Sequence, residues 1–166
     1  QGTITNADGS AYVIVAAWND NGPHGQGTVV FPDGAAFAGE FVDGTPNGQG
    51  TITWANGNVY EGAWLDGAIT GQGTQTWTDG TVYVGAWVDG ARTGQGTQTW
   101  TDGDVYVGGW ADGVRNGQGL YTWANGDVHA GAWLDGAITG QGTKTWGNGS
   151  IFAGEVYVGA WLDGDM

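Results

Sequence analysis

Residues 73–95, GTQTWTDGTVYVGAWVDGARTGQ, contain one complete copy of the pattern that repeats along this chain. The tripeptide Gly-Gln-Gly marks each copy, and its successive positions are 23 residues apart: Gly25, Gly48, Gly71, Gly94, Gly117 and Gly140. A fixed period of this length is typical of proteins built from stacked structural units. With an opening Gly2-Thr3, the sequence predicts about seven units in a single repeat domain, 1–166.

The expected unit boundaries follow from this spacing. They are about 2–26, 27–49, 50–72, 73–95, 96–118, 119–141 and 142–156, followed by an extra C-terminal strand at 157–166.

Each unit is expected to be a β-hairpin. Residues 74–77 form a short β-prone run, Asp79-Gly80 is a turn signal, and residues 82–87 form the return strand. Asp89-Gly90 then predicts a second turn toward the next unit. No stretch has helical periodicity, and 36 glycines would make helices costly. The sequence therefore predicts an all-β protein, an elongated single-sheet stack of antiparallel hairpins.

Aromatic residues recur at three positions of the unit. Because side chains alternate between faces along a strand, Tyr83, Gly85 and Trp87 share one face. One hairpin cannot bury such a face alone, whereas stacked hairpins can. The three expected structural ladders are Phe31, Trp54, Trp77, Trp100, Trp123 and Trp146; Phe41, Trp64, Trp87, Trp110 and Trp133; and Phe37, Tyr60, Tyr83, Tyr106, His129 and Phe152.

These motifs resemble the MORN repeat (membrane occupation and recognition nexus). The matching segments are Tyr60-Glu61-Gly62-Ala63-Trp64, Asp66-Gly67 and Gly71-Gln72-Gly73-Thr74, with further copies at 83–87 and 106–110. The resemblance covers nearly the whole chain and implies a hairpin stack with a scaffold or assembly role. The family's link to phosphoinositides is not expected to apply, because the basic residues that would hold phosphates are missing.

Charge excludes several partners. Three Lys or Arg stand against 17 Asp or Glu, giving a net charge of −14. Nucleic acid and anionic lipid are therefore not expected as partners, because both are bound through basic residues. Cysteine is absent, which excludes disulfides and thiol chemistry.

The two ends differ from the internal units. The first unit has two extra residues and the longest apolar β-prone stretch, which predicts either a bulged strand that closes the core or a docking surface. In the last unit, 152–156 are expected to complete the return strand, with Val156 in the tryptophan position. The second copy, Tyr157 to Leu162, is then either a tail over its own last hairpin or a donor strand for another subunit.

The main hypothesis is a non-enzymatic structural protein that assembles with itself, head to tail, into a filament or sheath. The C-terminal strand would pair with the N-terminal hairpin of the next subunit. The candidate interface residues are Ala11, Tyr12, Val13, Ile14, Val15, Trp18, Tyr157, Val158, Gly159, Ala160, Trp161 and Leu162.

Two alternatives stay open. The first is a monomeric or dimeric scaffold that binds another protein along its sheet. The second is a carbohydrate-binding module, since exposed aromatic rings stack on sugars; a binding module would leave at least one ladder exposed to solvent. An extracellular or cell-surface location is expected from the Thr/Gly/Asn-rich surface, the shortage of lysine and the start at Gln1.

No catalytic, cofactor or metal site is predicted. His24 is interpreted as a loop residue and His129 as a replacement for tyrosine. The recurring carboxylates Asp66, Asp89, Asp112 and Asp135 are interpreted as turn residues too far apart to share an ion. Residues 101–104 and 124–127 are oxygen-rich turns that leave weak calcium binding as a minor alternative.

Overall fold

The computed structural model describes residues 2–5, 11–148 and 151–162, with side chains described from 19 onward and at Ala17. All regular elements in this part of the chain are β-strands. They are β1 (Gly2–Thr5), β2 (Ala11–Asn19), β3 (Gly22–Val30), β4 (Ala36–Val42), β5 (Thr45–Thr53), β6 (Val59–Leu65), β7 (Ala68–Thr76), β8 (Val82–Val88), β9 (Ala91–Thr99), β10 (Val105–Ala111), β11 (Val114–Thr122), β12 (Val128–Leu134), β13 (Ala137–Thr145) and β14 (Val156–Trp161).

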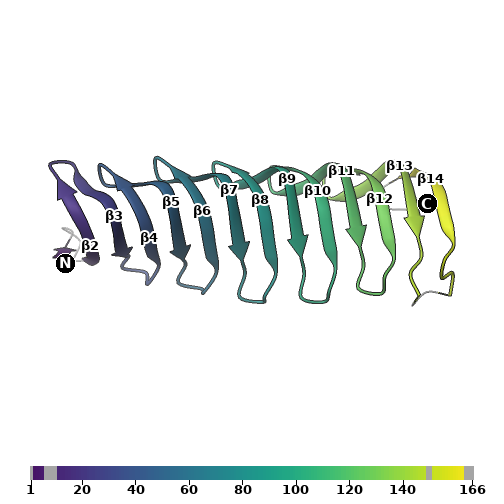
Figure 1. Cartoon of the computed structure of the whole chain (residues 1–166), viewed down its shortest axis with the longest axis horizontal. Helices are drawn as coiled ribbons and strands as arrows, with labels where there is room; N and C mark the ends of the chain where they lie inside the picture. Colours follow the sequence, from purple (N-terminus) through teal and green to yellow (C-terminus); the bar gives the residue numbers. More distant parts are fainter. Residues whose placement is uncertain (1, 6–10, 149–150, 163–166) are drawn as a thin grey trace. The chain divides into compact units, whose positions relative to one another are not determined.

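The chain divides into two compact units, which are described separately. Unit 1 is Gln1–Thr78 with Trp87–Gly90, and unit 2 is Asp79–Ala86 with Ala91–Met166. Within each unit the strands are antiparallel and lie side by side in chain order (Figure 1). The predicted all-β class of antiparallel hairpins is therefore confirmed. No helix in the described residues is long and apolar enough to span a membrane.

Two kinds of turn join the strands. The tight turn is Asp-Gly, in which both residues have positive φ, for example Asp112 at 48° and Gly113 at 83°. This backbone matches the right-handed twist of a hairpin, and Asp and Gly tolerate it. The other turn is longer and follows the end of each long strand. After β5, for example, it begins at Trp54, and Gly57 N–H donates to Trp54 O at 2.8 Å. Asp79-Gly80 belongs to this longer kind.

The long strands start earlier than the sequence predicts. Of the run expected at 74–77, residues 74–76 are the last part of β7, whose nine residues begin at Ala68, and Trp77 follows the end of the strand. Gly71-Gln72-Gly73 lies in the middle of this strand. Against β6, Gly62 pairs with Gly73 but Ala63 pairs with Thr70, so Gly71 and Gln72 form a bulge. Gly71 has φ of 61°, a conformation that favours glycine, which explains the recurring motif.

The C-terminal strand corrects the predicted unit boundaries. Residues 156–161 form β14, and Gly140 pairs with Trp161 just as Gly117 pairs with Trp133 one repeat earlier. Tyr157 to Trp161 is therefore the return strand of the last hairpin, and the prediction for 152–156 is wrong. Phe152 lies in the connection before β14, which is closed by Gly154 N–H donating to Trp146 O at 2.9 Å.

The physical reason is side-chain fit. Tyr157 and Trp161 carry the two large rings with glycine between them, as the internal return strands do. The segment 152–156 has Val156 where the second ring belongs, so it cannot fill the same space. In consequence Tyr157, and not Phe152, is the last member of the predicted ladder that contains Tyr60, Tyr83 and Tyr106. Trp161 extends the predicted ladder that ends at Trp133.

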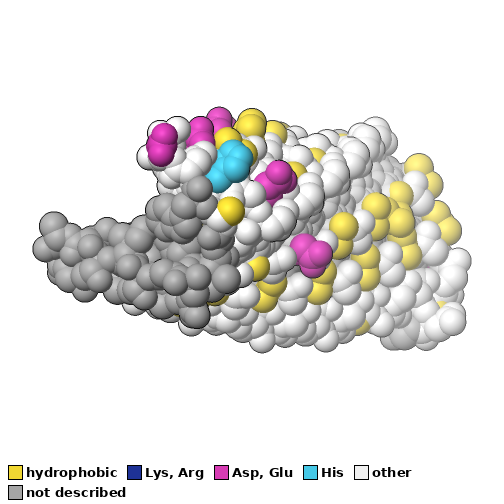
Figure 2. Space-filling model, turned by 60° about the vertical axis from the view of Figure 1, so that its left-hand side comes forward, with side chains coloured by type: hydrophobic (Ala, Val, Ile, Leu, Met, Phe, Trp, Pro, Cys, Tyr) yellow, Lys and Arg dark blue, Asp and Glu magenta, His cyan; other side chains and the backbone are white. Residues whose placement is uncertain are grey.

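The core of each unit is one face of its sheet. Ten of the buried apolar side chains are the tyrosine or tryptophan of a return strand or its phenylalanine equivalent: Phe37, Phe41, Tyr60, Trp64, Tyr83, Trp87, Tyr106, Trp110, Trp133 and Trp161. A single layer of strands therefore builds its core from aromatic rings that cover one side. The side of the molecule displayed in Figure 2, on which no Lys or Arg is visible, carries rows of hydrophobic side chains at its surface.

Candidate functional site on the aromatic face

Three sets of aromatic side chains share one face of the hairpins, but they differ in exposure. The buried tryptophan set is enclosed, and so is the tyrosine set apart from Tyr157, which is partly accessible; the half-exposed tryptophan set has intermediate solvent access throughout. The tyrosine set is Phe37, Tyr60, Tyr83, Tyr106, His129 and Tyr157; the buried tryptophan set is Phe41, Trp64, Trp87, Trp110, Trp133 and Trp161; the half-exposed tryptophan set is Phe31, Trp54, Trp77, Trp100, Trp123 and Trp146.

Glycines make room for the tyrosine set. Gly108 pairs with Gly119, and a Cβ built on either would overlap the Tyr106 ring or hydroxyl. Any larger residue would push the ring off the sheet, because interiors are close-packed. The same relation holds for Tyr60 with Gly62 and Gly73 in unit 1.

Two neighbouring tryptophans contact the Tyr60 ring, and two contact the Tyr106 ring, edge to face. In unit 2 the Tyr106 ring lies 5.4 Å from Trp110 and 5.2 Å from Trp133, measured between ring centroids, with interplanar angles of 84° and 76°. This T-shaped arrangement places positive ring edges against negative ring faces. The Tyr106 hydroxyl donates to Gly109 O at 3.0 Å, and burial raises its pKa to about 12. These rings are structural and give the face a fixed shape.

The sequence's three cations all lie on this face in unit 2. Arg92 Cζ is 4.4 Å from the Trp110 ring centroid, and Arg115 Cζ is 4.3 Å from that of Trp133. Lys144 Nζ is 4.1 Å from the Trp123 centroid. Each cation therefore contacts the face of an aromatic ring, a favourable position for positive charge.

The two arginines also clasp the tight turn of the following repeat. Gly113 N–H donates to Arg92 O, and the Arg92 side chain donates back to Gly113 O at 2.5 Å. Arg115 makes the equivalent pair of bonds with Gly136, its side chain donating at 2.8 Å. Burial lowers the pKa of both guanidinium groups from the usual value. The hydrogen bonds fix both guanidinium groups in place.

A hollow of about 220 Å³ lies between these two arginines. Its lining combines aromatic and cationic groups with polar ones: Arg92, Gln98, Trp100, Trp110, Gly113, Val114, Arg115 and Gly136. The buried Gln98 Oε1 accepts from Arg92 at 2.6 Å. In the described structure Lys144 pairs with Asp127 at 3.7 Å, whereas no described carboxylate lies within 4.0 Å of Arg115.

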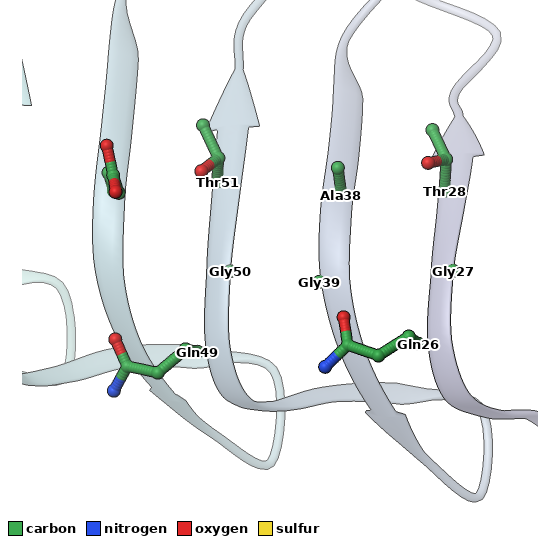
Figure 3. A pocket seen from close by; sticks show the side chains of 9 residues that line it. Gln26, Gly27, Thr28, Ala38, Gly39, Gln49, Gly50 and Thr51 are labelled. Carbon is green, nitrogen blue, oxygen red and sulfur yellow. The ribbon is translucent and has the colours of Figure 1, made fainter.

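A larger hollow, of about 550 Å³, lies in unit 1 on the opposite face (Figure 3). Gln26 and Gln49 extend from successive long strands beside the short side chains of Thr28, Ala38 and Thr51. Glu61 also lines it. The hollow exists because these side chains are small, and its lining offers neither an aromatic ring nor a cation. We therefore place the candidate site on the aromatic face.

The two histidines lie in different surroundings. His24 is in β3 rather than a loop and is exposed, with Nδ1 3.7 Å from Asp43 Oδ1. His129 occupies the tyrosine position and is fully buried between Trp133 and Trp161, with ring centroids 5.9 and 4.8 Å away. Both of its ring nitrogens lack a hydrogen-bond partner in the described structure. Burial, followed by the Lys144 charge, lowers the His129 pKa.

The turn carboxylates serve the fold. Asp66, Asp89, Asp112 and Asp135 are the positive-φ residues of the tight turns. Asp104 accepts Ala124 N–H at 2.8 Å and the Tyr121 hydroxyl at 2.5 Å, and Asp127 accepts Gly147 N–H at 2.8 Å. Among the described residues no three His, Asp or Glu side chains are grouped so that they could hold a metal ion.

The predicted subunit interface is placed only in part. The side chains of Ala11 to Val15 and of Trp18 lie outside the described residues. At the other end, Tyr157 and Trp161 face their own hairpin and are 5.6 Å apart, whereas Val158 and Leu162 are exposed.

Sequence reasoning missed the arginines of the aromatic face. The signal available was the 23-residue spacing of Arg92 and Arg115, which places them at the same position in consecutive repeats.

The MORN repeat model matches residues 17–36, 37–59, 60–82, 83–105, 106–128 and 129–151. The chain therefore belongs to the MORN-repeat family, with six matched repeats where the sequence spacing predicted about seven units. No curated protein matches this sequence.

Among solved structures, the chain is similar to the Drosophila melanogaster SAS-4 (dCPAP) TCP domain in complex with a proline-rich motif of Ana2. The two share 13% identity over 95% of this chain and 88% of that one, with a TM-score of 0.50. A crystal structure of the TCP10c domain of Drosophila melanogaster Sas-4 matches at 18% identity over 95% and 96%, with a TM-score of 0.42. At these identities the likeness concerns the fold alone.

Proposed function

We propose that this protein is a repeat scaffold that binds another protein through its aromatic face. The observation that carries the proposal is the half-exposed tryptophan set. The other two sets already provide the core, so these rings remain accessible on a rigid surface. Aromatic residues are enriched at protein interfaces because they supply large contact areas at low entropic cost.

The cations of unit 2 support the same surface. Arginine and tryptophan are the residue types that most often dominate binding energy at interfaces. Arg92, Arg115 and Trp100 meet around one hollow. A domain of similar fold was solved in complex with a proline-rich motif of another protein, which is the kind of partner proposed here.

The test is selection of peptides from a displayed random library on the full chain, followed by affinity measurements on variants. We expect selected peptides to lose at least tenfold affinity on Trp100→Ala or Trp123→Ala, the loss of a contributing aromatic contact. Val84→Thr and Val107→Thr are matched controls, because these exposed side chains belong to the opposite-face positions of return strands.

Circular dichroism first establishes that each variant is folded. Peptides whose affinity depends on Val84 and Val107 but not on the tryptophans would refute the proposed surface, as would a selection that yields no binder. Binding of soluble glycans that shifts tryptophan fluorescence would instead favour the carbohydrate-binding alternative.

Self-assembly is a second candidate. Within the described residues β14 pairs with β13 alone, and Val158 is 73% exposed on it. An open strand edge with apolar side chains is a template for pairing with another chain. Negative-stain electron microscopy of the full chain tests this candidate: filaments support it, and particles of constant single-chain mass contradict it.

A further inference from the structure

The hollow between Arg92 and Arg115 has a charge that contrasts with the rest of the chain. The protein carries a net charge of −14. Its cations lie within one aromatic surface, and Lys144 already has a carboxylate partner, Asp127. An acidic partner would thus be repelled by most of the molecule and attracted here. Charge complementarity of this kind fixes where and in which register a segment binds.

The chemistry of the hollow suits carboxylates. A guanidinium group presents five N–H donors in a planar fork, which matches a carboxylate. Arg115 uses one terminal nitrogen on Gly136 O, and the ring of Trp133 covers one face of its guanidinium group. The group is therefore oriented before any ligand arrives, which reduces the entropy cost of binding.

Repeat geometry sets the spacing of the partner's charges. Arg92 is on β9 and Arg115 at the equivalent position of β11, with β10 between them. Two strand separations amount to roughly 9–10 Å. Three residues of a polyproline II segment advance about 9.3 Å and return to the same side of the segment. Every third side chain of such a segment would therefore meet the next repeat.

We propose that the aromatic and arginine-lined hollow of unit 2 binds an extended acidic segment of a partner protein, with carboxylate side chains three residues apart. One carboxylate contacts Arg92 and the next contacts Arg115. The intervening apolar residues, proline being well suited, lie against Trp100. This inference rests on the proposed function and specifies its partner.

The test uses fluorescent synthetic peptides and the full chain, with affinity measured by anisotropy. The spaced peptide repeats Glu-Pro-Pro, a scrambled peptide places the same glutamates consecutively, and a neutral peptide repeats Gln-Pro-Pro. We expect the spaced peptide to bind at least tenfold more tightly than either of the others. Equal binding of the scrambled peptide, or no binding of the spaced one, would overturn the inference.

Protein variants locate the contact. Arg92→Gln and Arg115→Gln are each expected to weaken the spaced peptide at least tenfold, whereas Val107→Thr, on the opposite face, leaves its affinity within about twofold. If circular dichroism shows that an arginine variant is unfolded, a spaced peptide with a single Glu→Gln change tests the arginine–carboxylate contact on wild-type protein. Unchanged affinity there would also refute it. A phosphoserine peptide that outcompetes the glutamate peptide would reassign the hollow to phosphate groups.

The library-selected peptides separate this inference from the proposed function. Selected peptides that depend on Trp100 and Trp123 but carry no acidic residues, and that bind Arg92→Gln and Arg115→Gln normally, would overturn the acidic partner and leave the scaffold function standing. Selected peptides whose affinity depends on neither the tryptophans nor the arginines would contradict both the acidic partner and the scaffold function on the aromatic face.

Discussion

At the scale of single residues, the tyrosine set shows how histidine in place of tyrosine, at position 129, changes the hydrogen bonding of a buried side chain. Tyr83 and Tyr106 donate their hydroxyls to a backbone carbonyl three residues further on. His129 has a shorter side chain, and its two ring nitrogens have no partner in the described structure. An unsatisfied buried polar group typically costs about 1–3 kcal/mol. The position therefore tolerates histidine at a loss of stability.

Replacing His129 by tyrosine should stabilise the protein. We expect His129→Tyr to raise the free energy of unfolding by about 1–3 kcal/mol, because the hydroxyl can reach the carbonyl of Ala132 as its counterparts do. Urea unfolding followed by tryptophan fluorescence measures the change. His129→Phe separates the gain from removing the nitrogens from the gain of the new hydrogen bond. A destabilised His129→Tyr variant would contradict this account.

The same residue predicts a pH dependence. Burial lowers the His129 pKa in the folded state, so the unfolded state binds more protons once the pH falls below about 6.5, the unfolded value. Stability contributed by neutral His129 is therefore present above that pH and is lost as the pH decreases. Unfolding measured between pH 7 and pH 5 should show a steeper loss for wild type than for His129→Phe. Identical slopes would show that His129 does not titrate with unfolding.

Replacing a glycine that lies under a tyrosine ring should lower the stability of the protein. A Cβ at Gly96 would overlap the Tyr83 hydroxyl and ring. Overpacking typically costs about 1–3 kcal/mol, so Gly96→Ala should destabilise by that amount in thermal or urea unfolding. The neighbouring exposed Gln95→Ala is the matched control and should change stability by less than about 0.5 kcal/mol. Similar effects of both changes would argue against close packing at the ring.

At the scale of elements, the Asp-Gly turns explain why the acidic residues repeat. Asp66 has φ of 49°, and its side chain accepts a hydrogen bond from Asn47 at 3.2 Å. Asparagine tolerates this conformation, whereas a β-branched residue does not. The net negative charge is thus largely a consequence of turn geometry.

A pair of turn variants tests this explanation. We expect Asp66→Asn to retain stability and Asp66→Val to lose about 1–3 kcal/mol, the usual cost of strained backbone. The neighbouring exposed Leu65→Val, at an ordinary φ, serves as the control in the same thermal unfolding series. Equal stability of Asp66→Val and Asp66→Asn would contradict a conformational role for the aspartate.

The last hairpin gives an element-scale prediction as well. A chain that ends at residue 155 lacks β14, so the β13 amides that pair with it should lose protection from hydrogen exchange. A chain that ends at residue 162 is the control and should retain protection. Amides of β9 and β10 should be unaffected in both. Full protection of β13 in the shorter chain would contradict the assigned pairing.

The sequence predicts internal hairpins well because period, turn signals and ring positions all agree there. It fails at the last unit, where the segments that begin at Phe152 and at Tyr157 both match the start of a return strand. Only the packing of the second ring distinguishes them, because Val156 is too small to replace Trp161. It also begins the strand at residue 74, after Gly-Gln-Gly, because the bulge that carries the strand through this tripeptide depends on the register with β6, which spacing along one strand does not reveal. Arg92 and Arg115 were overlooked as site residues because their meaning comes from the rings of neighbouring repeats.

At the scale of the whole molecule, function follows from dividing aromatic residues between core and surface. The tyrosine and buried tryptophan sets make a rigid single-layer core in each unit, and the half-exposed tryptophan set remains available beside the arginines. The account therefore assigns binding to one face and leaves the opposite face, with its exposed Val84 and Val107, outside the site.

The most direct test is an indole ¹H–¹⁵N spectrum of the chain labelled at its 11 tryptophans, recorded with and without a library-selected peptide. Single Trp→Phe variants assign the signals. The account predicts that the Trp100 and Trp123 signals shift on binding, while Trp110, whose Nε1 donates to Gly96 O at 3.3 Å, moves least. A bound peptide that leaves every signal of the half-exposed tryptophan set in place would contradict the assignment of the aromatic face as the binding surface.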